Sequence, residues 1–156
     1  MSDKSSNDAR SSARLYAVQA LYQMDIAKTP LETIIREFVA HRLDTTIDDV
    51  EAPEADQAYF EGILRGVVDN QVFIDRHLNG YLSEGWRLSR IDSTMRAILR
   101  CGAYELIFNK DVPLRVITSQ YTDMAHSFFE GPEGGATNAL LDRLGNAVKS
   151  GEIDLL

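Results

Sequence analysis

Apolar residues recur every three or four positions along almost the whole chain, which is the spacing of one face of an α-helix. The most regular series is Met95, Ile98, Leu99, Gly102 and Leu106. Similar series occur within residues 8–26, 31–38, 60–67, 74–82, 117–128 and 137–148. No segment shows the alternation of apolar and polar residues that is typical of a strand. The pattern therefore predicts an all-α fold with about seven helices.

Capping residues, prolines and glycines predict where several of these helices begin and end. Thr29, Pro30 and Glu32 fit a capping box at the start of the second helix. Asp92 or Ser93 suits the N-cap of the fifth helix. The glycine-rich segment 129–135 is predicted to be a loop before the last helix.

The pattern also predicts how the chain is organised. A tail rich in serine and charge, residues 1–8, is expected to be flexible, and one helical domain follows over residues 9–150. Between the second and third helices, the stretch from Asp44 to Glu61 holds seven acidic residues and no basic one, which indicates a solvated loop. Seven amphipathic helices imply an all-α bundle with one contiguous core, which this loop divides into an N-terminal pair of helices and a C-terminal set. The residues expected to be buried in the core are Ile98, Leu99, Leu106, Ile117, Leu141 and Leu144.

The composition indicates the compartment in which the protein is expected to work. The 156 residues suit one compact domain, and the single cysteine, Cys101, excludes an internal disulfide and fits a reducing compartment. The N-terminus has no apolar core of the kind that signal peptides carry. No apolar run reaches the roughly 18–20 residues of a membrane span. We therefore expect a cytoplasmic protein that makes no membrane contact.

The residues that could support catalysis or metal binding do not form a recognisable site. The three histidines, His41, His77 and His126, are far apart and lie at no metal-ligand spacing. Cys101 falls within an apolar helix, so we interpret it as a buried structural thiol and not as a nucleophile. The glycine-rich segment 130–135 lacks the lysine and hydroxyl residue of a phosphate-binding loop. The sequence therefore predicts a binding protein that has no cofactor and is not an enzyme.

The charge distribution leaves two interpretations open. The net charge of −8 disfavours a nucleic-acid partner, but most of it lies in the acidic stretch. Arg10 and Arg14 are four positions apart and share one helix face, with Tyr22 further along the same helix. Residues 86–115 carry a local excess of three positive charges. Arginines and tyrosines can contact phosphates and unpaired bases, so these features fit either an RNA-binding face or an ordinary solvated surface.

Four segments carry a family resemblance. They read ARLYAVQALYQMD at 13–25, RAILRCGAYEL at 96–106, DVPLRVI at 111–117 and NALLD at 138–142. In this order they resemble the NusB family of bacterial transcription antitermination factors. Together they span nearly the whole chain, and the resemblance implies an all-helical fold of two sub-bundles.

The resemblance also implies a function and the residues that perform it. NusB proteins pair with NusE, a small-subunit ribosomal protein, and the pair binds boxA-like single-stranded RNA. The complex then joins the elongating RNA polymerase and supports transcription of ribosomal RNA operons. Residues matching the family's RNA-binding positions are Arg10, Arg14, Arg115, His126, Phe128 and Asn138. Residues expected at the protein-partner contact are Tyr22, Met95 and Arg96.

One region departs from the family pattern and keeps an alternative function open. Across residues 129–137 a basic and an aromatic residue of the family are missing, and Glu130 and Glu133 are present. The alternative is a NusB-like protein-interaction module with weak or lost RNA binding. NusB-like domains also precede some ribosomal RNA cytosine methyltransferases, but these 156 residues contain no glycine-rich cofactor motif, which disfavours that interpretation.

Overall fold

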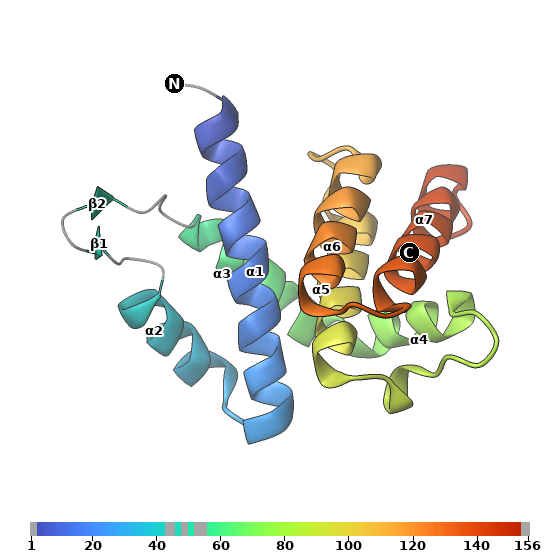
Figure 1. Cartoon of the computed structure of the whole chain (residues 1–156), viewed down its shortest axis with the longest axis horizontal. Coiled ribbons are helices and arrows are strands. Elements are labelled where there is room, and N and C mark those ends of the chain that lie inside the picture. The colour runs from blue at the N-terminus through green and yellow to red at the C-terminus, as the bar shows by residue number, and fades with distance from the viewer. Residues whose placement is uncertain (1–2, 43–45, 48–49, 52–55, 154–156) are drawn as a thin grey trace. The chain divides into compact units, whose positions relative to one another are not determined.

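In the computed structural model, residues 3–42, 46–47, 50–51 and 56–153 are described, and they form seven α-helices (Figure 1). The helices are α1 (Asp3–Ala27), α2 (Leu31–His41), α3 (Gln57–Asp69), α4 (Gln71–Tyr81), α5 (Ser93–Phe108), α6 (Leu114–Phe128) and α7 (Glu133–Ser150). A short 3-10 turn, η1 (Leu88–Arg90), precedes α5. This confirms the predicted all-α fold class. None of the described helices combines the length and the apolar composition needed to cross a bilayer.

Two very short strands interrupt the acidic loop. The strands β1 (Thr46–Ile47) and β2 (Val50–Glu51) pair antiparallel, with Thr46 opposite Glu51 and Ile47 opposite Val50. The expectation that the chain has no strand was therefore wrong here. Strands of two residues are too short to show the alternation on which that expectation rested.

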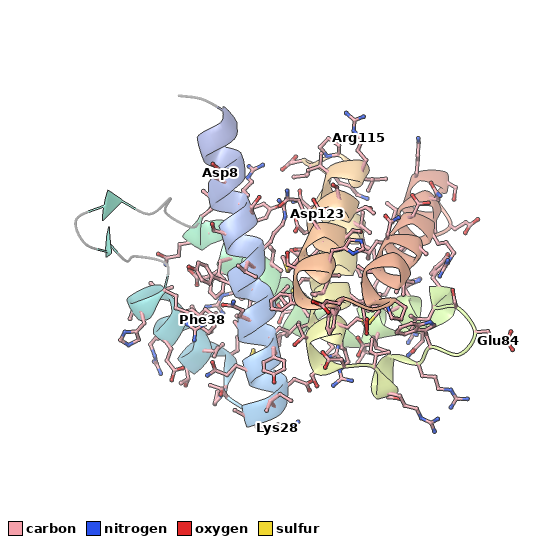
Figure 2. The ribbon with its side chains drawn as sticks, in the orientation of Figure 1. Asp8, Lys28, Phe38, Glu84, Arg115 and Asp123 are labelled. Atoms are coloured by element: carbon pink, nitrogen blue, oxygen red, sulfur yellow. The ribbon has the colours of Figure 1, made fainter. Side chains whose placement is uncertain are left out.

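The chain divides into two compact units, residues 1–66 and 67–156. The division falls within α3, whereas the sequence placed it in the loop after α2. The start of α3 joins the first unit because Phe60 stacks on Phe38 of α2, with ring centroids 5.7 Å apart. On the side of α2 that faces α1, Phe38 also meets Tyr16 edge-on at 6.4 Å (Figure 2).

The core of the second unit is built around α5, which packs against α4, α6 and α7. Every residue of the predicted core is fully buried, namely Ile98, Leu99, Leu106, Ile117, Leu141 and Leu144. Gly102 allows the helices to approach closely, because a Cβ atom there would lie 3.1 Å from Leu141 and 3.3 Å from Tyr121. The glycine in the apolar series is therefore a packing residue.

One of the two predicted helix caps is present. The Asp92 carboxylate accepts hydrogen bonds from the backbone nitrogens of Thr94 (2.7 Å) and Met95 (3.3 Å), as expected for an N-cap. The capping box predicted for α2 was wrong. Pro30 occupies the N-cap position there and no side chain caps the helix, so Thr29 lies one residue too early.

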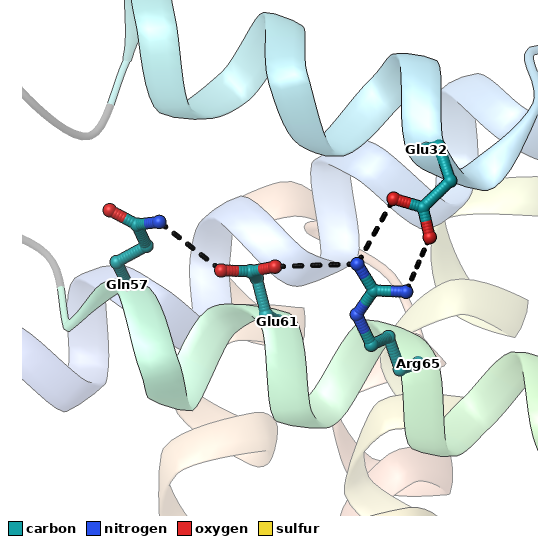
Figure 3. A network of polar contacts seen from close by, with 4 residues as sticks. All are labelled: Glu32, Gln57, Glu61 and Arg65. Atoms are coloured by element: carbon teal, nitrogen blue, oxygen red, sulfur yellow. Dashed lines mark hydrogen bonds and ion pairs between the residues drawn. The ribbon is translucent and has the colours of Figure 1, made fainter.

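Glu32, the other half of that expected box, takes part in a different network (Figure 3). Arg65 donates to both oxygens of Glu32 at 2.5 and 3.1 Å, and to Glu61 at 3.5 Å. Gln57 in turn donates to Glu61 at 3.2 Å. The Arg65 hydrogen bond lowers the pKa of the Glu32 carboxyl. Because the network is solvent-exposed, it links α2 to α3 without contributing much to stability.

Two helices begin earlier than the sequence indicated. The α1 helix begins at Asp3, so helical backbone extends into the tail of residues 1–8. Because helix ends fray, the flexibility of that tail stays a prediction. The α7 helix begins at Glu133, so the loop predicted for 129–135 is shorter than expected. Gly134 lies in the first turn of α7, where a Cβ atom would collide with the His126 ring at the end of α6.

Candidate nucleic-acid interface

The two arginines of α1 that the sequence assigns to RNA binding both lie against the ring of Tyr59 in α3. Each guanidinium carbon is 5.1 Å from the centroid of that ring. Arg14 Nη2 also donates a hydrogen bond to the Tyr59 hydroxyl at 2.9 Å. Arg10 is half-buried, whereas Arg14 is only 3% exposed. The expectation of one exposed face is therefore wrong for Arg14, because its guanidinium contacts the ring and the hydroxyl of Tyr59 within the first unit.

Tyr59 is a residue that the sequence did not single out. Its backbone nitrogen donates to the Asp56 carboxylate at 2.9 Å, which fixes its place in the first turn of α3. The residue lies 45 positions from Arg14 in the chain. No local pattern connects residues so far apart, so only the folded chain reveals this contact.

In the second unit, a polar groove runs between α6 and α7. Its volume is about 670 Å³, and its lining includes Arg115 and Asn138, two of the predicted RNA-binding residues. Arg115 is exposed and extends outward from the first turn of α6 (Figure 2). The Asn138 side-chain oxygen accepts a hydrogen bond of 3.5 Å from Thr122 across the groove. The structure thus brings together two residues that the sequence separates by a helix and a loop.

The groove also contains residues that the sequence analysis missed. Asn146 and Lys149 of α7 line it together with Ser119 of α6. Asn138, Asp142, Asn146 and Lys149 follow one another at helical spacing, and that spacing was the available signal. Asp123 and Asp142 balance the charges of Arg115 and Lys149, so the groove offers hydrogen-bonding groups more than net positive charge.

His126 and Phe128 lie at the opposite end of α6. Both are exposed, and Phe128 retains 45% of its accessible surface. The Phe128 ring lies 6.5 Å from that of Phe129, and the His126 ring covers Gly134 of α7. At about 1.5 Å per residue, these side chains are about 16–20 Å along the helix from Arg115. Three of the predicted RNA-binding residues of this unit, Arg115, His126 and Phe128, therefore lie along α6, and Asn138 lies on α7.

The predicted protein-partner residues differ in their accessibility. Tyr22 is 40% exposed on α1, whereas Met95 is 1% exposed. Met95 lies at a groove of about 570 Å³ that Trp86, Arg87 and Arg90 also line. The structure corrects the expectation that Met95 presents its side chain to a partner, because that side chain is buried.

Arg96 has an internal role in addition to the one expected from the sequence. Its guanidinium donates to the carbonyl oxygens of Leu88 (3.1 Å) and Ile91 (3.3 Å) and to the Ser93 hydroxyl (3.2 Å). These bonds tie η1 to the start of α5. Arg100 is likewise engaged, with two 2.9 Å bonds to Asp75 of α4. Part of the positive excess in residues 86–115 therefore stabilises the fold and is not available to a partner.

Cys101 is a buried structural thiol, as the sequence predicted. Burial raises the pKa of the thiol, and the neighbouring Glu105 carboxylate adds to the shift. Glu105 itself is buried and accepts a 2.5 Å hydrogen bond from the Tyr121 hydroxyl. A thiol held in its protonated form is a poor nucleophile, so this cluster belongs to the core and not to a reactive site.

Comparison with known proteins now identifies the family. The model of the NusB family matches residues 11–146. The transcription antitermination protein NusB of Caulobacter vibrioides is 47% identical over 135 residues, which cover 86% of this chain and 91% of that protein. Its counterpart in Rhizobium etli is 47% identical over 141 residues, 90% of this chain and 88% of the relative. The chain belongs to the NusB family. These relatives are antitermination proteins and not enzymes, in agreement with the predicted binding role.

Solved structures of NusB proteins have the same fold. NusB from T. maritima matches with a TM-score of 0.73 and 29% identity, covering 88% of this chain and 90% of that one. A structure of the antitermination factors NusB and NusE in complex with dsRNA matches with a TM-score of 0.73 and 22% identity. That match covers 89% of this chain and 97% of the other, and at this identity the likeness concerns the fold alone.

Proposed function

We propose that this NusB family member is a transcription antitermination factor that pairs with NusE and binds boxA-like single-stranded RNA. The match to the family over residues 11–146 is the observation that carries the proposal. The solved complex of NusB, NusE and dsRNA supports it, since a protein of this fold assembles there with both kinds of partner. The complex would act on the RNA polymerase elongation complex in the cytoplasm and support transcription of ribosomal RNA operons.

The structure favours particular residues for RNA contact. Arg10 at the first unit, and Arg115 and Asn138 in the α6–α7 groove, have accessible polar groups that suit phosphate and base contacts. His126 and Phe128 are exposed and can interact with phosphates and unpaired bases respectively. For the NusE contact, Tyr22 remains the most accessible of the three proposed residues.

The proposal is tested by measuring the binding of boxA-like RNA to the complex with NusE over a series of salt concentrations. Replacing both arginines, Arg10→Ala with Arg14→Ala, should weaken binding. Removing one phosphate contact to single-stranded RNA reduces the slope of log K against log salt by about 0.7. Because Arg14 is buried, Arg10→Ala alone should account for the change in slope. Unchanged affinity and slope in a folded double variant would exclude α1 as part of the RNA site.

A second function is supported by the loop before α7. Glu130 is exposed and Glu133 begins α7, so this part of the surface is acidic where the family offers a more favourable surface for RNA. The chain would then be a protein-interaction module whose RNA binding is weak or lost. The same titration separates the two functions, because that module would bind NusE and leave the RNA free.

A further inference from the structure

We propose that Tyr59 is a positioning residue that holds Arg10 in place for contact with an RNA phosphate; this inference rests on the proposed RNA-binding function. All three residues involved, Arg10, Arg14 and Tyr59, belong to the first unit. Their arrangement assigns different roles to the two arginines, which the sequence treated as equivalent.

The Tyr59 ring is fixed from several sides. Arg14 binds its hydroxyl at 2.9 Å and also lies over its ring. The Tyr59 backbone nitrogen donates to Asp56, and the next residue, Phe60, is buried and stacked on Phe38. A ring held by its hydroxyl, by its backbone and by its neighbour in the helix is a rigid platform.

Arg10 lies one helical turn before Arg14 and reaches the same platform. Its guanidinium carbon is 5.1 Å from the ring centroid, within the range of a cation–π contact. A carboxylate partner would neutralise the guanidinium, whereas an aromatic ring restrains it without cancelling its charge. A long arginine side chain normally loses conformational freedom when it binds a phosphate, and this contact removes part of that loss in advance.

Burial separates the roles of the two arginines. Arg14, at 3% exposure, acts through Tyr59 by fixing the ring, while half-buried Arg10 remains accessible to a ligand. Arg10 is therefore the residue that would touch the RNA, and Tyr59 and Arg14 act through it. The ring of Tyr59 is the essential part, because the ring restrains Arg10 and the hydroxyl only orients the ring.

The test uses the full chain in complex with NusE and a fluorescent boxA-like single-stranded RNA. Tyr59→Leu removes the ring and should raise the Kd about two- to tenfold, the range expected for one cation–π contact and one restrained side chain. Tyr59→Phe keeps the ring and should stay within about twofold of the wild type. In an Arg10→Gln background, Tyr59→Leu should have almost no additional effect, because a positioning residue has nothing left to position.

A matched control separates positioning from general loosening of α3. Phe60→Leu disturbs the same turn but leaves the Tyr59 ring in place, so any decrease in affinity that it causes should persist in the Arg10→Gln background. Circular dichroism checks that each variant is folded, and Tyr59→Met replaces Tyr59→Leu should the latter unfold.

Two results would overturn the inference while leaving the proposed function intact. One is a Tyr59→Leu complex that binds RNA like the wild type. The other is a decrease in affinity that is equally large in the Arg10→Gln background. Failure of the proposed function gives a different result, since the wild-type complex would then bind no boxA-like RNA, and that result overturns the positioning role as well.

Discussion

At the scale of single residues, the second unit contains a thiol that the core keeps protonated. Cys101 is completely buried, and Glu105, one helical turn away, is buried with a hydrogen bond from Tyr121. Burial, followed by the influence of the Glu105 charge, raises the pKa of the Cys101 thiol. The folded chain therefore retains a thiol proton that the unfolded chain releases in mildly alkaline solution.

This difference predicts how stability depends on pH. An unfolded cysteine titrates at about pH 8.5, so the contribution of the thiol is fully present below that value and is lost as the pH rises above it. One proton corresponds to a slope of at most about 1.4 kcal/mol per pH unit. Urea unfolding between about pH 7 and 10 should show the wild type losing stability faster than Cys101→Ala. Parallel curves for the two proteins would show that the thiol does not titrate differently on folding.

Apolar residues of the same core predict the cost of truncation. Leu106 is fully buried in α5, so Leu106→Ala should lower the free energy of unfolding by about 2–5 kcal/mol. Val72 of α4 is 76% exposed and provides the control, since Val72→Ala should change stability by less than about 0.5 kcal/mol. Chemical denaturation measures both, and a decrease below about 0.5 kcal/mol at Leu106 would contradict its place in the core.

At the scale of elements, helix ends explain why some boundaries followed from the sequence and others did not. Asp92 caps α5 through its side chain, in the way that the residue type predicts. The α2 helix has no side-chain cap, because Pro30 stands at the N-cap and Thr29 precedes it. At α7, acidic Glu133 in the first turn suits the helix dipole, so the helix begins despite the two glycines that follow.

Asp92 and Thr29 should respond differently to the same substitution, because only Asp92 caps a helix. Asp92→Ala should lower the free energy of unfolding by about 0.5–2 kcal/mol, because two backbone nitrogens of α5 lose their acceptor. Asp92→Asn, which keeps a capping oxygen, should be close to the wild type. Thr29→Ala should be nearly neutral, since that hydroxyl caps nothing. Equal decreases at the two positions, measured by thermal unfolding, would contradict this assignment.

At the scale of the whole molecule, the net charge of −8 opposes the RNA binding that we propose, because RNA is itself negatively charged. The acidic stretch from Asp44 to Glu61 supplies most of that charge, and basic residues elsewhere are divided between internal and exposed positions. Arg96 and Arg100 are used within the fold, while Arg87, Arg90 and Arg115 remain exposed. RNA affinity in this chain should therefore depend on a few accessible cations and on the NusE partner, not on the overall field.

The acidic residues before and at the start of α7 provide the matching prediction. Glu130→Gln with Glu133→Gln should tighten RNA binding by the NusE complex by at most about 30-fold, because each surface charge contributes about 1 kcal/mol or less. Most of the gain should come from exposed Glu130, since Glu133 is half-buried. The gain should shrink at high salt because of screening. Glu84→Gln, at another exposed glutamate, is the control, and an equal gain there would show a nonspecific charge effect.

Sequence alone determined the helical fold class, the buried series of α5 and the NusB resemblance. The first two follow from the spacing of apolar residues, and the third follows from short motifs. The tertiary structure decided the rest. It placed the unit boundary within α3, buried Arg14 against Tyr59, and aligned Arg115 with Asn138 in one groove. Each of these facts depends on contacts between residues far apart in the chain, and helical periodicity is the same whether a polar side chain faces solvent or a partner on another helix.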